Sequence, residues 1–365
     1  MDLEYTYREV ARRLQSIDPG ALWPGLTWGE FALYNACQAT MGQGLFPRPK
    51  EFRGNTAVAW EGKMVAIWGV TETDEEDLDL LTANMAHELF HVFQMKRGES
   101  RFPNDLAALT DPMESSLLAV KREENRELIR AVEEQDREKS RGHLARFLAL
   151  RKKRETLSGR SCPQEYWAET VEGIAEYVGG RTLNALDREK YAGRLKAYEK
   201  SLVEPSALLL DPRRLAYYTG TLLLLGAQKA GLSLFHEIGE EKRPVCELLK
   251  DKLLPGAVGT VQPFPQGEAL LEEQRKSRET VLSSFFDRGP QYRPGHFTIT
   301  GYDPMNLWLL EDKLYGSHFW VLKNRGGGET IQLLGPTVLV WNGEEVTGFW
   351  TENTKAEKEF TRWVM

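Results

Sequence analysis

The sequence predicts an α+β fold: a mainly helical body with a small edge sheet, followed by a small antiparallel β module. Apolar residues recur at helical spacing through most of the first 262 of the 365 residues. After residue 286, short β-rich runs alternate with turn residues. The Gly- and Pro-rich stretch 259–267 is typical of a linker. We therefore expect one domain over residues 1–262, and a second, made of a helix and the β module, over residues 263–365.

The body begins with two predicted helices and a hairpin. Apolar spacing predicts the helices at 3–17 and 28–41. Two β-rich runs follow at 56–60 and 63–68, and Glu61-Gly62 joins them. A two-residue connection that contains glycine is typical of a tight β-hairpin, so we expect a hairpin here.

The next segment, 75–97, carries apolar residues at helical spacing and acidic residues in its first turn. It ends with a basic residue, Lys96, shortly before Gly98, a residue type that commonly terminates helices. Thr73 and Glu76 have the spacing of a capping box. These signals predict a single helix over residues 75–97.

Mixed charges crowd residues 112–157, which predicts long, largely solvated helices inserted into the body. Aromatic residues are frequent in the C-terminal β-rich runs, and we expect them in the core of the sheet rather than on a ligand platform. These residues include Trp308, Trp320, Trp341 and Trp350. Further helices are predicted at about 163–183, 187–203, 213–230, 242–253 and 268–286.

Composition narrows the class of protein. Hydrophobic residues make up 41% of the chain and charged residues 28%, as in ordinary globular proteins. The formal net charge of −7 argues against nucleic acid as a partner. The three cysteines have no paired spacing, which favours a reducing, cytoplasmic compartment. We find neither a signal-peptide pattern nor a run long enough to span a membrane, so we expect no membrane partner.

The strongest chemical signal is His87-Glu88-Leu89-Phe90-His91, an H-E-x-x-H motif inside the predicted helix 75–97. Residues four apart on a helix point the same way, so the two imidazoles can bind one Zn²⁺ ion. Glu88 lies beside them, where it can activate a water on the metal. The alternative interpretation is two surface histidines on a polar helical face. Of the other four histidines, only His143 is kept, as a distant reserve ligand.

A zinc site of this kind needs a third protein ligand. The extended motif that adds a third histidine is excluded, because Gln94 and Arg97 occupy the required positions. Residues 166–177 offer three carboxylates instead, Glu169, Glu172 and Glu176. Glu172 and Glu176 are one helical turn apart, so one can bind the metal while the other orients a ligand imidazole.

HELFH followed by EGIAEY resembles the gluzincin zinc metallopeptidases. The resemblance implies that Glu172 is the third ligand and that Glu176 orients a ligand imidazole, with Glu169 as the fallback ligand. Tyr217-Tyr218-Thr219-Gly220 is similar to the Y-x-x-G of aminopeptidase-like members, which implies that Tyr217 stabilises the oxyanion. A packed helical aromatic is the alternative for Tyr217.

The resemblance covers residues 56–220 and implies a zincin-like catalytic domain in which the hairpin supplies a substrate-aligning edge strand. The implied activity is zinc-dependent cleavage of peptide or protein substrates, with Glu88 activating the water. The segment between His91 and Glu172 is longer than in compact members, and the inserted helices at 112–157 account for it. No motif for binding a free amino terminus is present, and the sequence does not indicate the cleavage specificity or the oligomeric state.

Two other classes of function remain open from the sequence. One is a zincin-like binding or regulatory protein that does not cleave and uses its C-terminal β module; the intact Glu88 argues against it. The other is a metal-free helical interaction protein in which the motif arose by chance. Zinc content separates the second class from the first.

Overall fold

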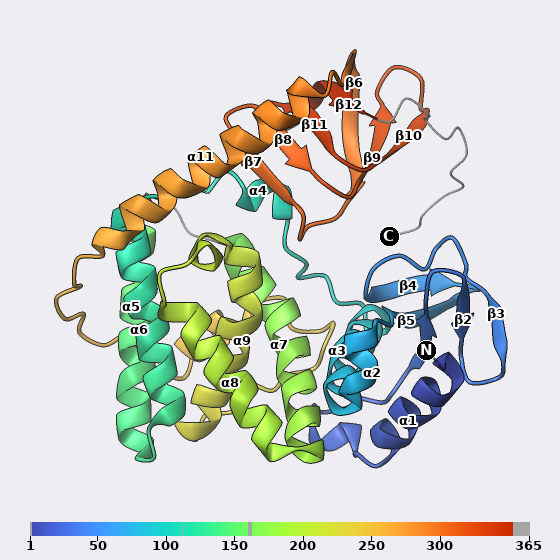
Figure 1. Cartoon of the computed structure of the whole chain (residues 1–365). Helices are drawn as coiled ribbons and strands as arrows, with labels where there is room; N and C mark the ends of the chain where they lie inside the picture. The colour runs from blue at the N-terminus through green and yellow to red at the C-terminus, as the bar shows by residue number, and fades with distance from the viewer. Residues whose placement is uncertain (1, 112, 160–162, 353–365) are drawn as a thin grey trace. The chain divides into compact units, whose positions relative to one another are not determined.

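The computed structural model describes residues 2–111, 113–159 and 163–352 and has an α+β fold (Figure 1). It divides into two units. The first comprises Met1–Pro103, Ala119–Glu204 and Arg214–Gln262; the second comprises Asn104–Leu118, Pro205–Arg213 and Pro263–Met365. The sequence assigned 104–118 and 205–213 to the helical body. In the structure both group with the second unit. In the first segment, Leu106 and Leu109 pack against the core of the unit's sheet. In the second, η2 (Ala207–Leu210) contacts α11 (Pro265–Asp287).

In the part of the first unit that the structure describes, five strands form a mixed sheet in the order β3-β2-β1-β5-β4. The predicted hairpin is confirmed: Glu61 and Gly62 have φ angles of 47° and 77°, the left-handed values that such a turn requires. Strand β4 forms one edge of the sheet. The strands are β1 (Glu30–Tyr34), β2 (Gln38–Thr40), β3 (Leu45–Pro47), β4 (Thr56–Trp60) and β5 (Lys63–Gly69).

The helix predicted at 28–41 is wrong, because this segment forms β1 and β2. Residues 31–34 are all buried, since β1 lies inside the sheet between β2 and β5 and both of its faces are covered. A strand buried on both faces reads as a continuous apolar run, and such a run cannot be told from a buried helix by its periodicity.

Two helices of the first unit, α1 (Leu3–Gln15) and α3 (Leu78–Lys96), share a core with the sheet. The sequence predicted a single helix over 75–97, but the structure divides this segment at Asp77. Helix α2 (Glu72–Glu76) ends there, and the side chain of Asp77 caps the start of α3. The capping box is formed by Thr71 and Asp74 rather than by Thr73 and Glu76. As predicted, the chain leaves α3 at Gly98, whose φ is 73°.

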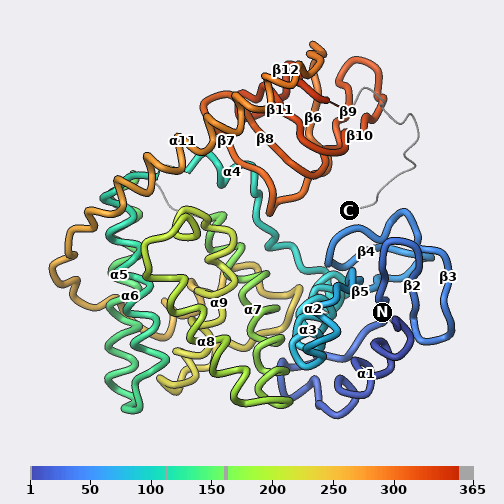
Figure 2. The backbone as a smooth tube through the Cα atoms, viewed as in Figure 1, coloured from blue at the N-terminus to red at the C-terminus, as the bar shows by residue number. Residues whose placement is uncertain are grey.

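Helix α3 packs along α7 (Pro163–Leu186), and both can be followed in Figure 2. The approach is close, since a Cβ atom on Gly179 would lie 2.8 Å from the Ala83 carbonyl oxygen. Helix α9 (Pro212–Lys229) is equally close to α7, because a Cβ atom on Gly173 would lie 2.5 Å from the Gly220 Cα. The remaining helical segments are η1 (Pro19–Ala21), α4 (Asp105–Ala108), α5 (Ser115–Glu133), α6 (Arg137–Ser158), α8 (Arg188–Val203), η2 (Ala207–Leu210), α10 (Val245–Lys250) and α11 (Pro265–Asp287).

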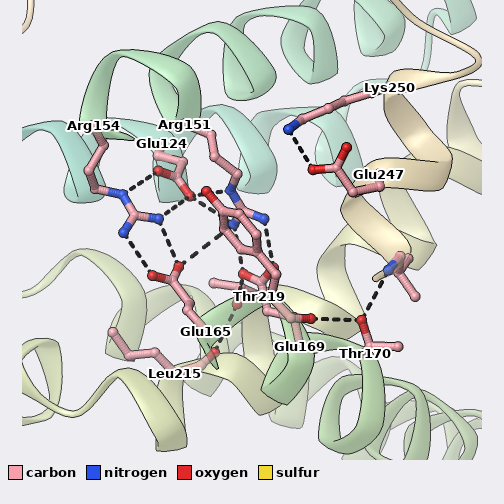
Figure 3. Close-up of polar contacts among 12 residues, drawn as sticks. Glu124, Arg151, Arg154, Glu165, Glu169, Thr170, Leu215, Thr219, Glu247 and Lys250 are labelled. Carbon is pink, nitrogen blue, oxygen red and sulfur yellow. Dashed lines mark hydrogen bonds and ion pairs between the residues drawn. The ribbon is translucent and has the colours of Figure 1, made fainter. Parts of the chain in front are cut away.

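The charged helices α5 and α6 are less solvated than predicted. Together with α7 they bury three cationic and three anionic side chains, so each charge has a partner. Figure 3 shows the centre of this group, which we call the buried ion cluster. The guanidinium of Arg151 is also held between the rings of Phe147 and Tyr166. The buried ion cluster consists of Lys121, Glu124, Arg151, Arg154, Glu165 and Glu169.

In the described part of the second unit, seven strands form an antiparallel sheet in the order β10-β9-β6-β12-β11-β8-β7. Trp320 and Trp341 lie in its core as predicted, whereas Trp308 and Trp350 are only half-buried. The strands are β6 (Gln291–Tyr302), β7 (Leu307–Leu310), β8 (Lys313–Gly316), β9 (Phe319–Asn324), β10 (Thr330–Leu334), β11 (Thr337–Trp341) and β12 (Val346–Thr351).

Within the described residues, no helix combines the length and the hydrophobicity needed to cross a membrane. Cys37 and Cys246 are free thiols, the first exposed and the second buried. Cys162 lies outside the described residues. The cytoplasmic location stays a prediction from the sequence.

Candidate metal centre

Helices α3 and α7 bring together three of the residues that the sequence singled out. The Nε2 atoms of His87 and His91 are 3.0 Å apart, as expected for imidazoles one turn apart on the same face of α3. The Oε2 atom of Glu172, on α7, lies 3.6 Å from the first of these nitrogens and 3.2 Å from the second. His87, His91 and Glu172 therefore form a compact group that can hold a metal ion.

The hydrogen bonds of Gln94 determine which nitrogen of His91 carries the proton. The Gln94 side-chain amide donates to the carbonyl oxygen of Val171, on α7, over 3.1 Å. Its Oε1 atom, which can only accept, lies 2.7 Å from His91 Nδ1. His91 therefore carries a proton on Nδ1, and in its neutral form its Nε2 presents a lone pair to the group.

Glu176 determines which ring nitrogen of His87 carries the proton. Its Oε2 accepts a hydrogen bond from His87 Nδ1 over 3.0 Å, while its Oε1 accepts from Arg194 over 3.0 and 2.6 Å and from the Tyr198 hydroxyl. Burial by itself raises the pKa of Glu176, but Arg194 and His87 lower it to about 2. Glu176 is therefore a carboxylate, and it keeps the proton of a neutral His87 on Nδ1.

The two imidazoles thus direct their Nε2 atoms at each other and at a carboxylate oxygen, an arrangement that requires a positive charge. Without a metal, a proton supplies it: burial lowers the pKa of His87, but hydrogen bonds to Glu172 and Glu176 raise it to about 10. Ligands at about 2.0–2.1 Å around a tetrahedral Zn²⁺ ion lie about 3.3 Å from one another. The separations of 3.0, 3.2 and 3.6 Å fit such an ion.

Glu88 lies beside this group and is buried on α3. Among the residues that the structure describes, none forms a side-chain hydrogen bond or ion pair with Glu88. Burial raises the pKa of its carboxyl group, and the neighbouring His87 and His91 oppose that rise. A buried carboxylate with an uncommitted proton-accepting oxygen is suited to general-base chemistry.

Tyr217, on α9, lies against the same site. Its ring stacks on the imidazole of His87, with ring centroids 5.5 Å apart and planes 5° from parallel. The close approach of α7 and α9 at Gly173 and Gly220 makes this contact possible. The structure therefore places the aromatic side chain that the Y-x-x-G resemblance singled out next to a candidate metal ligand.

Glu169, the fallback ligand, lies elsewhere. Its two carboxylate oxygens accept hydrogen bonds from Arg151 at 2.7 Å each, and Oε1 also accepts one from Thr219 at 2.7 Å. This pairing buries Glu169 inside the protein. The reserve ligand His143 pairs with Glu127 and is not part of the metal group.

Sequence reasoning missed three residues that hold the site together. Gln94 carries a readable signal, since it lies three residues after His91 and therefore on the same face of the helix. The sequence gives no such signal for Arg194 and Tyr198. Both lie on α8, and no local spacing in the sequence relates them to Glu176 on α7. Comparison with known proteins adds no assignment: no family model, no curated protein and no solved structure matches the chain.

Proposed function

We propose that the protein is a zinc-dependent hydrolase of the gluzincin type that cleaves peptide bonds. The observation that carries the proposal is the orientation of the two imidazoles. Gln94 and Glu176 fix both Nδ1 protons, so both Nε2 atoms face the Oε2 atom of Glu172. Helix α3 alone does not require this arrangement, and two surface histidines would not show it.

In this proposal, His87, His91 and Glu172 hold zinc, and Zn²⁺ supplies the positive charge that polarises a water molecule and the scissile carbonyl. Glu88 removes a proton from the attacking water and delivers it to the leaving amine. Burial supports this role, because a raised pKa brings the carboxyl group closer to the pH at which it works. Tyr217 donates to the oxyanion of the tetrahedral intermediate.

The edge strand β4 supports a peptide or protein as substrate. Its outer edge has backbone groups that an extended peptide can pair with, and β4 contacts the helix that carries the histidines. Recognition by strand addition uses main-chain hydrogen bonds and therefore accepts many sequences.

Metal content and proteolysis test the proposal together. Protein purified without added metal or chelator should contain close to one zinc per chain by elemental mass spectrometry, and the double variant His87→Ala, His91→Ala should contain none. Fluorescein-labelled casein should be cleaved by the zinc-containing protein, and cleavage should stop on chelation and return with added Zn²⁺. Zinc without cleavage of casein or of a peptide library would favour the non-catalytic binding protein. Absence of zinc would refute the proposal.

A further inference from the structure

Five residues around the candidate metal centre are linked in a closed circuit, in which four links are side-chain contacts and the fifth is the peptide bond between two neighbouring residues. His87 bonds to Glu176, and Glu176 accepts a hydrogen bond from Tyr198. The ring of Tyr198 stacks on Tyr218, with centroids 4.5 Å apart and planes 14° from parallel. Tyr218 directly follows Tyr217, whose ring stacks on His87 and closes the circuit. The contacts join α3, α7, α8 and α9.

Tyr198 contributes to this circuit in two separable ways. Its hydroxyl donates to Glu176 Oε1 and accepts from Arg194 Nε, which fixes the carboxylate whose other oxygen orients His87. Its aromatic ring supports Tyr218 and therefore the turn of α9 that presents Tyr217. Tyr198 is buried, so few other conformations are open to it.

We propose that Tyr198 is a positioning residue that couples the orientation of the metal ligand His87 to the placement of Tyr217. The proposal rests on the zinc-hydrolase function and goes beyond it, because neither the motif nor the ligand set involves α8. Tyr198 contacts Glu176 and Arg194 on one side and the ring of Tyr218 on the other. It acts through Glu176 on one side and through Tyr218 on the other.

Two variants separate the two contributions. Tyr198→Phe keeps the stacking ring and removes the hydroxyl, so it should weaken zinc binding about tenfold, the lower end of the range for residues that orient a ligand. Tyr198→Leu removes both, so it should also lower kcat on casein while KM stays within about twofold. Zinc affinity is measured by competition with a chromophoric chelator, a readout that needs no turnover.

Tyr191 provides the matched control. It lies on the same helix, seven residues before Tyr198, and packs against α7 at Gly180 rather than at Glu176. If loosening of the α7–α8 contact were the only effect, Tyr191→Phe and Tyr191→Leu would reproduce the losses seen at Tyr198. We expect both control variants to retain wild-type zinc affinity and kcat.

Coupling to Tyr217 is measured by a double-mutant cycle. Tyr217→Phe should lower kcat in the wild-type and Tyr198→Phe proteins and have a much smaller effect in Tyr198→Leu, where the supporting ring is absent. Equal effects of Tyr217→Phe in all three backgrounds, or unchanged zinc affinity in Tyr198→Phe, would overturn the inference while the hydrolase stands. Wild-type protein that binds no zinc, or cleaves nothing, would instead show that the proposed function itself has failed.

Discussion

Glu169 and Glu172 lie one turn apart on α7 and face different partners. Glu169 is bonded to the guanidinium of Arg151 through both oxygens, whereas Glu172 directs an oxygen at the two imidazoles of α3. The first carboxylate is neutralised by the protein itself. The second lies where a metal cation can neutralise it, which is why the same helix can supply both a structural acid and a candidate ligand.

Replacement of each of these glutamates by glutamine should therefore have a different consequence. Glu172→Gln should abolish stoichiometric zinc binding, and it should also destabilise the metal-free protein, since a protonated His87 loses one of the two carboxylates that raise its pKa. Glu169→Gln should keep one zinc per chain but destabilise the fold by about 3–5 kcal/mol, since it leaves Arg151 buried without its full counter-charge. Zinc content by mass spectrometry and urea unfolding check both expectations. Loss of zinc in Glu169→Gln with a normal fold would reverse the assignment.

Glu88→Gln should retain the metal and lose turnover. The substitution keeps the size of the side chain but removes the proton-accepting oxygen, so a decrease in kcat of about 10²–10⁴-fold is expected. Zinc content measured in parallel should equal that of the wild type. A variant with near wild-type turnover would remove Glu88 from the mechanism.

Gln94→Leu should weaken zinc binding about 10- to 100-fold, because His91 loses the acceptor that holds its proton on Nδ1. The substitution also leaves the Val171 carbonyl without its side-chain donor. Chelator competition gives the affinity. Gln228→Leu is the control for loss of a glutamine side-chain hydrogen bond, since the exposed Gln228 donates to the Tyr177 hydroxyl and is not part of the metal group. Its zinc affinity should stay at the wild-type value.

Stability should decrease in acid because of the buried ion cluster. Burial raises the pKa of Glu124, but Arg154, Lys121 and Arg151 lower it to about 2, and the pKa of Glu165 is lowered as well. A carboxyl group whose folded pKa is depressed contributes stability that is fully present above its unfolded pKa of about 4.3 and is lost as the pH falls through the folded value.

For Glu124 this contribution is on the order of 3 kcal/mol. The free energy of unfolding should therefore be nearly constant from pH 7 to about 5 and decrease steadily towards pH 2. Urea unfolding at a series of pH values measures it. In Glu124→Gln the decrease should be shallower, and an unchanged slope in this variant would show that other carboxyl groups cause the acid sensitivity.

Gly220→Ala should force α7 and α9 apart, because the added Cβ atom would lie 2.3 Å from the carbonyl oxygen of Glu169. We expect destabilisation of about 1–3 kcal/mol or more, with a larger loss of kcat than of zinc affinity as Tyr217 moves away from His87. Gly193→Ala, on α8, is the control: nothing lies within 4 Å of its Cβ position, so the exchange should stabilise the helix slightly. Thermal unfolding measures the stability of both variants, and steady-state kinetics measures their kcat.

Local signals in the sequence were enough for several elements of the fold and for the core of the candidate site. The turn at Glu61-Gly62 and the end of α3 at Gly98 depend on a few neighbouring residues with left-handed backbone angles. The spacing of His87 and His91 follows from helix geometry alone. The segment that contains Glu172 could also be predicted as a helix, but its role as a ligand came only from resemblance.

Contacts between distant segments decided the rest. The segment 28–41 forms strands because β1 pairs with β5, and the charges of α5 and α6 are buried because partners on another helix neutralise them. The proton on His91 depends on Val171, and the orientation of His87 depends on α8 through Glu176. Periodicity along a chain reports which face of a helix is apolar. Only the packed structure determines which carbonyl, carboxylate or ring lies opposite, because those partners come from elsewhere in the sequence.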